Sequence, residues 1–171
     1  NAEVHRFAGK GEALAFIKET FAKEGVADQP QAYAVWVDSP FLEGMDKDAL
    51  VAEHPGLKFN VTRDMAEKAR IGVTQMQWGV ANTGTLAQNS TAVAERLASM
   101  LPFIHLAIVG TDSIVPDMPA LLETVHPKDA AYLALISGPS RTADIEPVLT
   151  IGVHGPERLI IVCIDDLGGS N

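Results

Sequence analysis

Three apolar runs in the second half of the chain constrain its fold more than any other feature. They are FIHLAIVG (103–110), YLALIS (132–137) and LIIVCID (159–165). The gaps between the runs carry apolar residues at helical spacing, namely Met118, Leu121, Leu122 and Val125, then Ile145, Val148 and Leu149. Apolar strands that alternate with helices indicate a parallel sheet buried on both faces. The sequence therefore predicts an α/β fold with a mostly parallel sheet and helices on both faces.

The first half of the chain continues this alternation. Leu14, Ile17 and Phe21 form one apolar helical face, and Gly25 is expected to end that helix. The stretch AYAVWV (32–37) follows as a buried strand. The pattern further predicts a helix over 47–52, a strand over 57–60, a helix over 62–69 and a helix carrying Val93, Leu97 and Met100.

Composition limits the class of protein and of partner. The chain has 171 residues, which suits one domain, since domains most often hold roughly 100–150 residues. A formal net charge of -9 repels nucleic-acid phosphates and anionic membranes, so we expect neither as a partner. No apolar run approaches the roughly 20 residues that a membrane span needs, and the cytoplasm is the expected compartment.

Cysteine and histidine offer little metal chemistry. Cys163, the single cysteine, lies in LIIVCID and is interpreted as a core residue. One cysteine cannot build an iron–sulfur cluster or a cysteine-rich zinc site, and His5, His54 and His126 lack a ligand spacing such as HExxH. We therefore expect no metal and no cofactor within this chain. His105, which alternates with apolar neighbours, is interpreted as a hydrogen-bonded core residue.

The first two residues, Asn1 and Ala2, look like the remnant of a cut tag. Residues 3–171 are then expected to form a single domain.

Polar residues follow the three apolar runs, where the carboxyl ends of parallel strands meet. They are Asp112 after the first run, Ser137, Gly138, Ser140, Arg141 and Thr142 after the second, and Asp165 at the third. The hydroxyls, the Arg141 guanidinium and the free N–H groups of a helix start suit a carboxylate or phosphate. In the alternative, Ser140 or Thr142 merely caps a helix. Asp165 with Asp166 either binds a divalent ion or a sugar hydroxyl, or ends its strand in solvent.

A second polar group lies in GVTQMQWGVANTGTLAQNS (72–90). Asn82, Thr83, Gly84 and Thr85 fall between two short apolar runs and predict a tight turn that joins two strands. A hairpin accounts for these residues, and a ligand site at the turn is the alternative. Trp78 beside the turn is interpreted as a core or rim aromatic.

Four stretches of the sequence resemble the LUD-domain proteins of the LutC (YkgG) type. They are GVTQMQWGVANTGTL, RLASMLPFIHLAIVGTDSIVPD, LISGPSRTADIE and IGVHGP, in this order between residues 70 and 165. The resemblance implies a NagB/RpiA/CoA-transferase-like α/β fold, in agreement with the alternation of strands and helices. It also implies a role beside LutA/LutB-type iron–sulfur proteins that oxidise L-lactate to pyruvate, with the clusters held by those partners.

Asn82 departs from the family pattern, and His154 matches the pattern but has two possible roles. Family members often carry Asp or Glu where this chain has Asn82. Coenzyme A transferases of the related fold use a glutamate nucleophile, and an asparagine amide cannot form the acyl anhydride, although it could orient a ligand. His154 in GVHGP suits an acid or base, but the preceding helix would place it on the order of 15 Å from Ser140. Fixing the turn before Pro156, or a subunit contact, is the alternative role.

Two functions of different class follow. The first is an accessory or small-anion-binding subunit of a lactate-oxidising system, with the ligand held by residues 137–142 and the turn at 82–85. The second is a stand-alone enzyme of the isomerase or acyl-transfer type, inferred by analogy with the fold. We favour the first, because no nucleophile is aligned with a base in the sequence.

Overall fold

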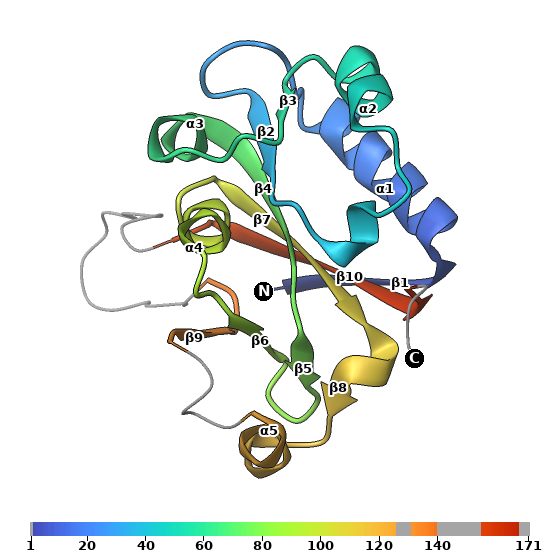
Figure 1. Cartoon of the computed structure of the whole chain (residues 1–171), viewed down its shortest axis with the longest axis vertical. Helices are drawn as coiled ribbons and strands as arrows, with labels where there is room; N and C mark the ends of the chain where they lie inside the picture. The colour runs from blue at the N-terminus through green and yellow to red at the C-terminus, as the bar shows by residue number, and fades with distance from the viewer. Residues whose placement is uncertain (1, 126–130, 140–154, 168–171) are drawn as a thin grey trace, which may run out of the picture.

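A parallel sheet of six strands forms the centre of the computed structural model, which describes residues 2–125, 131–139 and 155–167 (Figure 1). Its order is β1 (Ala2–Gly9), β10 (Arg158–Asp166), β7 (Ile104–Gly110), β4 (Ala69–Gln75), β2 (Tyr33–Trp36) and β3 (Leu57–Lys58). Every neighbouring pair of strands in this sheet is parallel. The predicted α/β fold with a mostly parallel sheet is confirmed.

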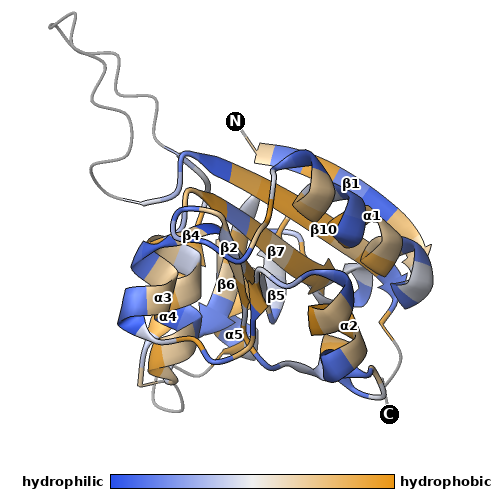
Figure 2. Cartoon of the chain, turned by 90° about the horizontal axis from the view of Figure 1, so that it is seen from above, coloured by the Kyte–Doolittle hydropathy of each residue, from blue (hydrophilic) through white to orange (hydrophobic). Residues whose placement is uncertain are grey.

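Helices cover both faces of this sheet. On one face α1 (Lys10–Lys23) and α2 (Lys47–Glu53) bury Ile17, Phe21 and Leu50 against the strands. On the other face α3 (Arg63–Glu67) and α4 (Val93–Met100) pack Met65 and Ala98 against β2 and β4. Figure 2 shows these two pairs of helices on opposite sides of the strands. Burial on both faces explains why β7 and β10 are apolar almost throughout.

Local signals in the sequence set the helix ends. The side chains of Asp46 and Thr62 accept hydrogen bonds from backbone N–H groups in the first turns of α2 and α3. Gly25, two residues after α1 ends, adopts a φ of 70°, a left-handed conformation that favours glycine. The predicted end of α1 at this glycine is confirmed. No helix in the described part of the chain is long and apolar enough to span a bilayer.

A second sheet of four strands packs beside the first. Its order is β8 (Ile114–Val115), β5 (Trp78–Val80), β6 (Thr85–Asn89) and β9 (Leu133–Ile136), and α5 (Met118–Thr124) packs against it. β5 and β6 form the antiparallel hairpin that the turn residues predicted. Leu86 of β6 and Met76, which lies between β4 and β5, form one apolar cluster with Ala107, Val109 and Cys163 of β7 and β10.

The position of β9 corrects one prediction. The run YLALIS was expected to form a central strand of the parallel sheet, but β9 pairs antiparallel with β6 in the second sheet. The physical reason is visible in its burial: no residue of β9 is fully buried, and Leu135 is 50% exposed. The place next to β7 belongs to β10, which the chain reaches later.

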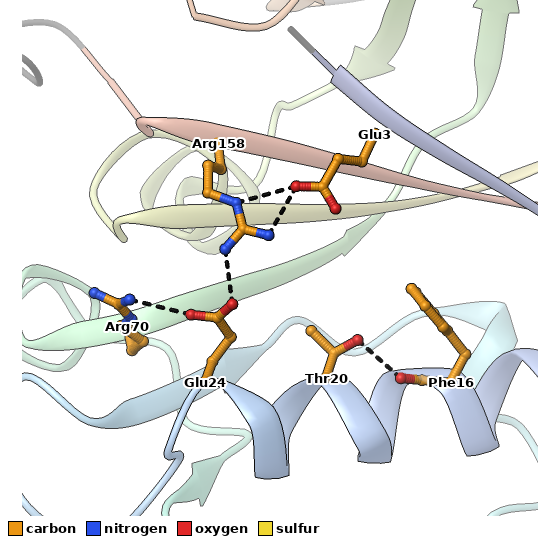
Figure 3. A network of polar contacts seen from close by, with 6 residues as sticks. All are labelled: Glu3, Phe16, Thr20, Glu24, Arg70 and Arg158. Atoms are coloured by element: carbon orange, nitrogen blue, oxygen red, sulfur yellow. Dashed lines mark hydrogen bonds and ion pairs between the residues drawn. The ribbon is translucent and has the colours of Figure 1, made fainter.

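An ion-pair network ties the amino ends of several strands to α1 (Figure 3). The Glu24 carboxylate, whose side chain is only 9% exposed, accepts hydrogen bonds from Arg158 at 2.7 Å and Arg70 at 3.1 Å. Arg158 also donates two bonds to Glu3. Burial alone would raise the pKa of Glu24, but the bonds from Arg158 and Arg70 outweigh it and hold the pKa below its ordinary value.

Replacing Glu24 with alanine is expected to lower the free energy of unfolding by about 2 kcal/mol at neutral pH, because two arginines lose a buried partner. Since the folded state lowers the pKa of Glu24, this contribution is present above the ordinary carboxyl pKa of 4.5 and is lost as the pH falls below it. Urea unfolding at neutral and acidic pH measures both effects. The exposed Glu19 of the same helix is the control, as Glu19→Ala. Equal losses in the two variants would contradict the prediction.

Candidate functional site

The carboxyl edge of the parallel sheet contains a topological switch point between β2 and β4. The chain leaves β2 through α2 toward β3, at the edge of the sheet. It leaves β4 in the opposite direction, through the β5–β6 hairpin and α4 toward β7. Loops that leave neighbouring strands in opposite directions open a crevice between them, and ligands of α/β proteins bind in that crevice.

A pocket of about 340 Å³ occupies this crevice. Its lining comes from residues at or just after the ends of β2, β4, β7 and β10 and from residues of β5, β6 and α4. The lining residues are Asp38, Ser39, Pro40, Gln75, Met76, Gln77, Trp78, Gln88, Glu95, Gly110, Ser113 and Leu167. The volume falls in the range of roughly 300–1,000 Å³ that is usual for small-molecule sites.

Hydrogen bonds to the backbone fix three glutamines in this pocket. The Oε1 atom of Gln75 accepts the N–H of Phe41 at 2.8 Å, and Oε1 of Gln77 accepts the N–H of Asn89 at 2.8 Å. Gln88 is buried, and its Nε2 donates to the carbonyl of Gln75 at 3.0 Å. These bonds orient the Gln75 and Gln77 amides, and their Nε2 groups have no partner within the described part of the chain.

Two further polar groups of the pocket lack partners. The Ser39 hydroxyl is buried and forms no hydrogen bond with any described residue. Glu95, in the first turn of α4, is partly buried and forms no hydrogen bond or ion pair with a described residue. Burial raises the pKa of the Glu95 carboxyl, and the charge of Arg96 opposes this only in part. A carboxyl with a raised pKa in a pocket is a candidate functional group.

Asp38 is less available for a ligand than Glu95. Its carboxylate pairs with the Lys47 ammonium at 2.7 Å, and this hydrogen bond lowers the pKa of Asp38. Lys47 therefore compensates the charge of Asp38, whereas the charge of Glu95 has no such partner among the described residues.

Three of the residues that the sequence singled out form a chain of hydroxyl groups. Thr83 donates to Thr85 at 2.8 Å, and Thr85 in turn shares a hydrogen bond of 2.8 Å with Ser137. The turn and the start of the 137–142 segment therefore lie side by side, at the far end of the β5–β6 hairpin. Asn82 is exposed at this turn, and Gly84 adopts a φ of 65° that the turn requires.

The two predicted aspartates at the carboxyl edge of the parallel sheet, Asp112 and Asp165, already have hydrogen-bond partners within the protein. Asp165 accepts hydrogen bonds from Arg6 at 2.9 Å and from Thr111 at 3.0 Å, and the bond from Arg6 is the main reason its pKa is lowered. Asp112 accepts a bond from Ser113. The ends of β7 and β10 thus meet as predicted, but neither aspartate is among the residues lining the pocket.

The remaining predicted site residues divide into two groups. Gly138 is described, with a φ of 92° that an L side chain rarely adopts. Ser140, Arg141, Thr142 and His154 lie outside the described residues, as does the helix expected around Ile145. Their proposed roles stay predictions.

Buried residues follow the predictions more closely. His105 is 1% exposed, and its Nε2 lies 2.8 Å from the Thr74 hydroxyl, which confirms its interpretation as a hydrogen-bonded core residue. Cys163 is buried in the core between the two sheets, as predicted, and burial raises the pKa of its thiol. In the described ranges, no three side chains of His, Cys, Asp or Glu gather where they could hold a metal ion.

The fold and the pocket define an α/β domain with a crevice at the carboxyl edge of its parallel sheet. The LUD domain family model matches residues 1–164, and the chain belongs to this family. The resemblance drawn from the four sequence stretches is therefore confirmed.

Several relatives are 28–36% identical to this chain over the aligned residues. YkgG of Escherichia coli (strain K12), an uncharacterized protein, is 36% identical over 107 residues, which cover 59% of this chain and 46% of YkgG. Lactate utilization protein C of Bacillus subtilis (strain 168) is 35% identical over 107 residues, which cover 59% of this chain and 45% of that protein. The matched region is thus about half the length of these curated relatives.

Two broader matches extend along more of the chain. Lactate utilization protein C of Macrococcus caseolyticus is 28% identical over 165 residues, 92% of this chain and 63% of that protein. The crystal structure of a DUF162 family protein from Deinococcus radiodurans has a TM-score of 0.51 at 20% identity, and covers 91% of this chain and 98% of its own. This last likeness concerns the fold alone.

Proposed function

We propose that this chain has a LutC-type role in lactate utilization, as a small-anion-binding component that acts with iron–sulfur proteins in the oxidation of L-lactate to pyruvate. The observation that carries the proposal is the family match over residues 1–164 together with several relatives named lactate utilization protein C. The sequence supports the division of labour with partners. The single cysteine of this chain cannot by itself hold an iron–sulfur cluster, and LutA/LutB-type partners are the proposed source of the electron carriers.

The proposed anion site is the hydroxyl chain of Thr83, Thr85 and Ser137. Each hydroxyl has one proton, and Thr83 donates its proton to Thr85, so one proton of the Thr85–Ser137 pair stays free for a lactate or pyruvate carboxylate. Thr85, which is buried within the hairpin, holds Ser137 in place for this bond. Ser137 leads directly into the segment that carries Ser140 and Arg141, for which we propose the remaining contacts with the anion.

Growth on lactate tests the role and the site together. In a Bacillus subtilis strain whose lactate utilization protein C has its matched segment replaced by this chain, we expect growth on L-lactate as the carbon source. Thr85→Val should slow that growth severalfold, because the hydroxyl chain loses its central member. Thr91→Val is the matched control, since Thr91 is exposed and bonds only the nearby Asn89.

Different outcomes would contradict the proposed role in lactate utilization and the proposed anion site. Failure of the parent replacement to grow on L-lactate, despite normal protein levels and growth on glucose, would contradict the proposed role. Growth that is the same with Thr85→Val and with Thr91→Val would contradict the hydroxyl chain as the anion site. Calorimetric titration of the purified chain with L-lactate and pyruvate gives the same comparison in vitro, with affinity about tenfold weaker expected for Thr85→Val.

A further inference from the structure

The pocket at the switch point is separate from the proposed anion site. Its residues follow β2 and β4, whereas the hydroxyl chain lies at the opposite end of the β5–β6 hairpin, at Thr85. The ligand of this pocket is therefore considered apart from lactate. The charge and the hydrogen-bonding groups of the pocket limit the chemical class of that ligand.

The charge of the pocket disfavours an anion. None of the described residues that line it is Lys, Arg or His, while Asp38 and Glu95 are both acidic. Lys47 pairs with Asp38, whereas Glu95 forms no ion pair with a described residue and its charge is offset only in part by Arg96. A phosphate or carboxylate placed here would meet like charge in a partly buried site, at a cost that solvent screens only in part.

Donors and acceptors in the pocket point to hydroxyl groups on the ligand. The Nε2 groups of Gln75 and of the exposed Gln77 form no hydrogen bond with a described residue and are free to donate to a ligand. The Glu95 carboxylate is an acceptor in need of a donor. An ammonium ion offers donors only, and a carboxylate offers acceptors only. A hydroxyl group both donates and accepts, so neighbouring hydroxyls on one ligand satisfy both kinds of group.

Apolar residues complete the site. Met76, Trp78, Pro40 and Leu167 also line the pocket, and Trp78 is only partly buried. The C–H face of a sugar-like ring packs well on an aromatic and an aliphatic wall of this kind. A mixed lining, with apolar walls and a few polar groups held in place, is typical of small-molecule sites.

From these observations we propose that the pocket binds a neutral, polyhydroxylated small molecule of the sugar or cyclitol class. Glu95 accepts hydrogen bonds from adjacent hydroxyls of the ligand, while the amides of Gln75 and Gln77 donate to its oxygens. The Trp78 ring packs on the apolar face of the ligand.

Ligand-observed NMR with the whole chain tests this proposal, using D-glucose, D-xylose and myo-inositol as probes. We expect at least one of them to bind, and its phosphate ester to bind more weakly. Glu95→Gln should weaken the neutral probe at least about tenfold, because a charge-assisted hydrogen bond is lost. Glu123→Gln, at an exposed position of α5, is the control and should leave the affinity unchanged.

Ser39→Ala is a second control at the pocket. Because its hydroxyl is covered and has no partner among the described residues, its removal should leave both the melting temperature and the affinity for the probe unchanged. Absence of binding by all three neutral probes, tighter binding of a phosphate ester, or unchanged affinity in Glu95→Gln would each overturn the proposal. L-lactate binding, measured in the same variants, should not respond to Glu95→Gln, so this test stands apart from that of the anion site.

Discussion

Replacing Gly72 with alanine is expected to lower the free energy of unfolding by about 3 kcal/mol, through overpacking between β4 and α4. A Cβ atom on Gly72 would overlap the carbonyl oxygen of Ala98 in α4 and come within 2.8 Å of the Pro102 side chain. Neither neighbour can yield easily, because one is helix backbone and the other a proline ring. The helix must therefore move away from the sheet, and urea unfolding measures the cost.

Gly79 in β5 supplies the matched control for this prediction. A Cβ atom there would meet only side-chain atoms, of Ile114 at 3.2 Å and of Leu86 at 3.8 Å. Gly79→Ala is therefore expected to cost about 1 kcal/mol or less. If Gly72→Ala were no more destabilising than Gly79→Ala, the close approach of α4 would not limit the packing. Since α4 also carries Glu95, its displacement should weaken any ligand of the pocket as well.

The contribution of His105 to the free energy of unfolding is expected to fall by about 3 kcal/mol as the pH drops from 6.5 to 4, because the unfolded chain takes up a proton that the buried ring does not. Burial lowers the pKa of His105 to about 4 from the ordinary 6.5. Between these values the unfolded chain binds a proton that the folded chain does not. The contribution of neutral His105 is thus complete above pH 6.5 and is lost as the pH falls toward 4.

His105→Gln checks the cause of this pH dependence. Glutamine keeps a polar group near Thr74 but does not titrate, so the difference in stability between the parent and the variant should shrink as the pH falls through this range. An NMR titration of the His105 ring gives a direct reading. A ring that becomes protonated near pH 6.5 in the folded state, or a pH dependence that survives in His105→Gln, would show that another group is responsible.

The sequence predicted the elements that are buried on both faces. β7 and β10 are continuous apolar runs because the sheet lies between layers on either side, and the α1 stripe of Ile17 and Phe21 faces that sheet. The turn at 82–85 was predictable because its chemistry is local. These patterns involve residues that are close together in the chain, so they can be recognised without knowledge of the tertiary structure.

Two strands of the parallel sheet, β1 and β4, have no continuous apolar run and were not predicted. β1 is an edge strand with most of its residues exposed or half-buried, so its sequence AEVHRFAG contains three charged or ionisable residues. β4 is central, yet Arg70, Gly72 and Thr74 interrupt its apolar pattern. Gly72 lacks a side chain where α4 approaches β4, and Thr74 forms a hydrogen bond with His105. Contacts with residues distant in the sequence therefore explain why polar and small residues occur in this strand.

The pocket was missed for a related reason. Its position depends on β2 and β4 being neighbours whose loops leave in opposite directions, and spacing along the sequence does not reveal that arrangement. A usable signal existed in Asp38 and Ser39, which come directly after a buried strand. Glu95 could not be found in this way, because it looks like any acidic residue in the first turn of a helix.

The position of β10 has a consequence for the order in which the protein folds during synthesis. Among the described strands, β1 forms its ladder with β10 alone, pairing Ala2 with Leu159 and Phe7 with Ile164. The ribosome therefore makes β10 more than 140 residues after β1. Until then, the edge of β7 that β10 will cover stays open, and contacts between such distant residues form slowly. A nascent chain halted after β9 should bind chaperones, and the synthesis and release of β10 should end that binding.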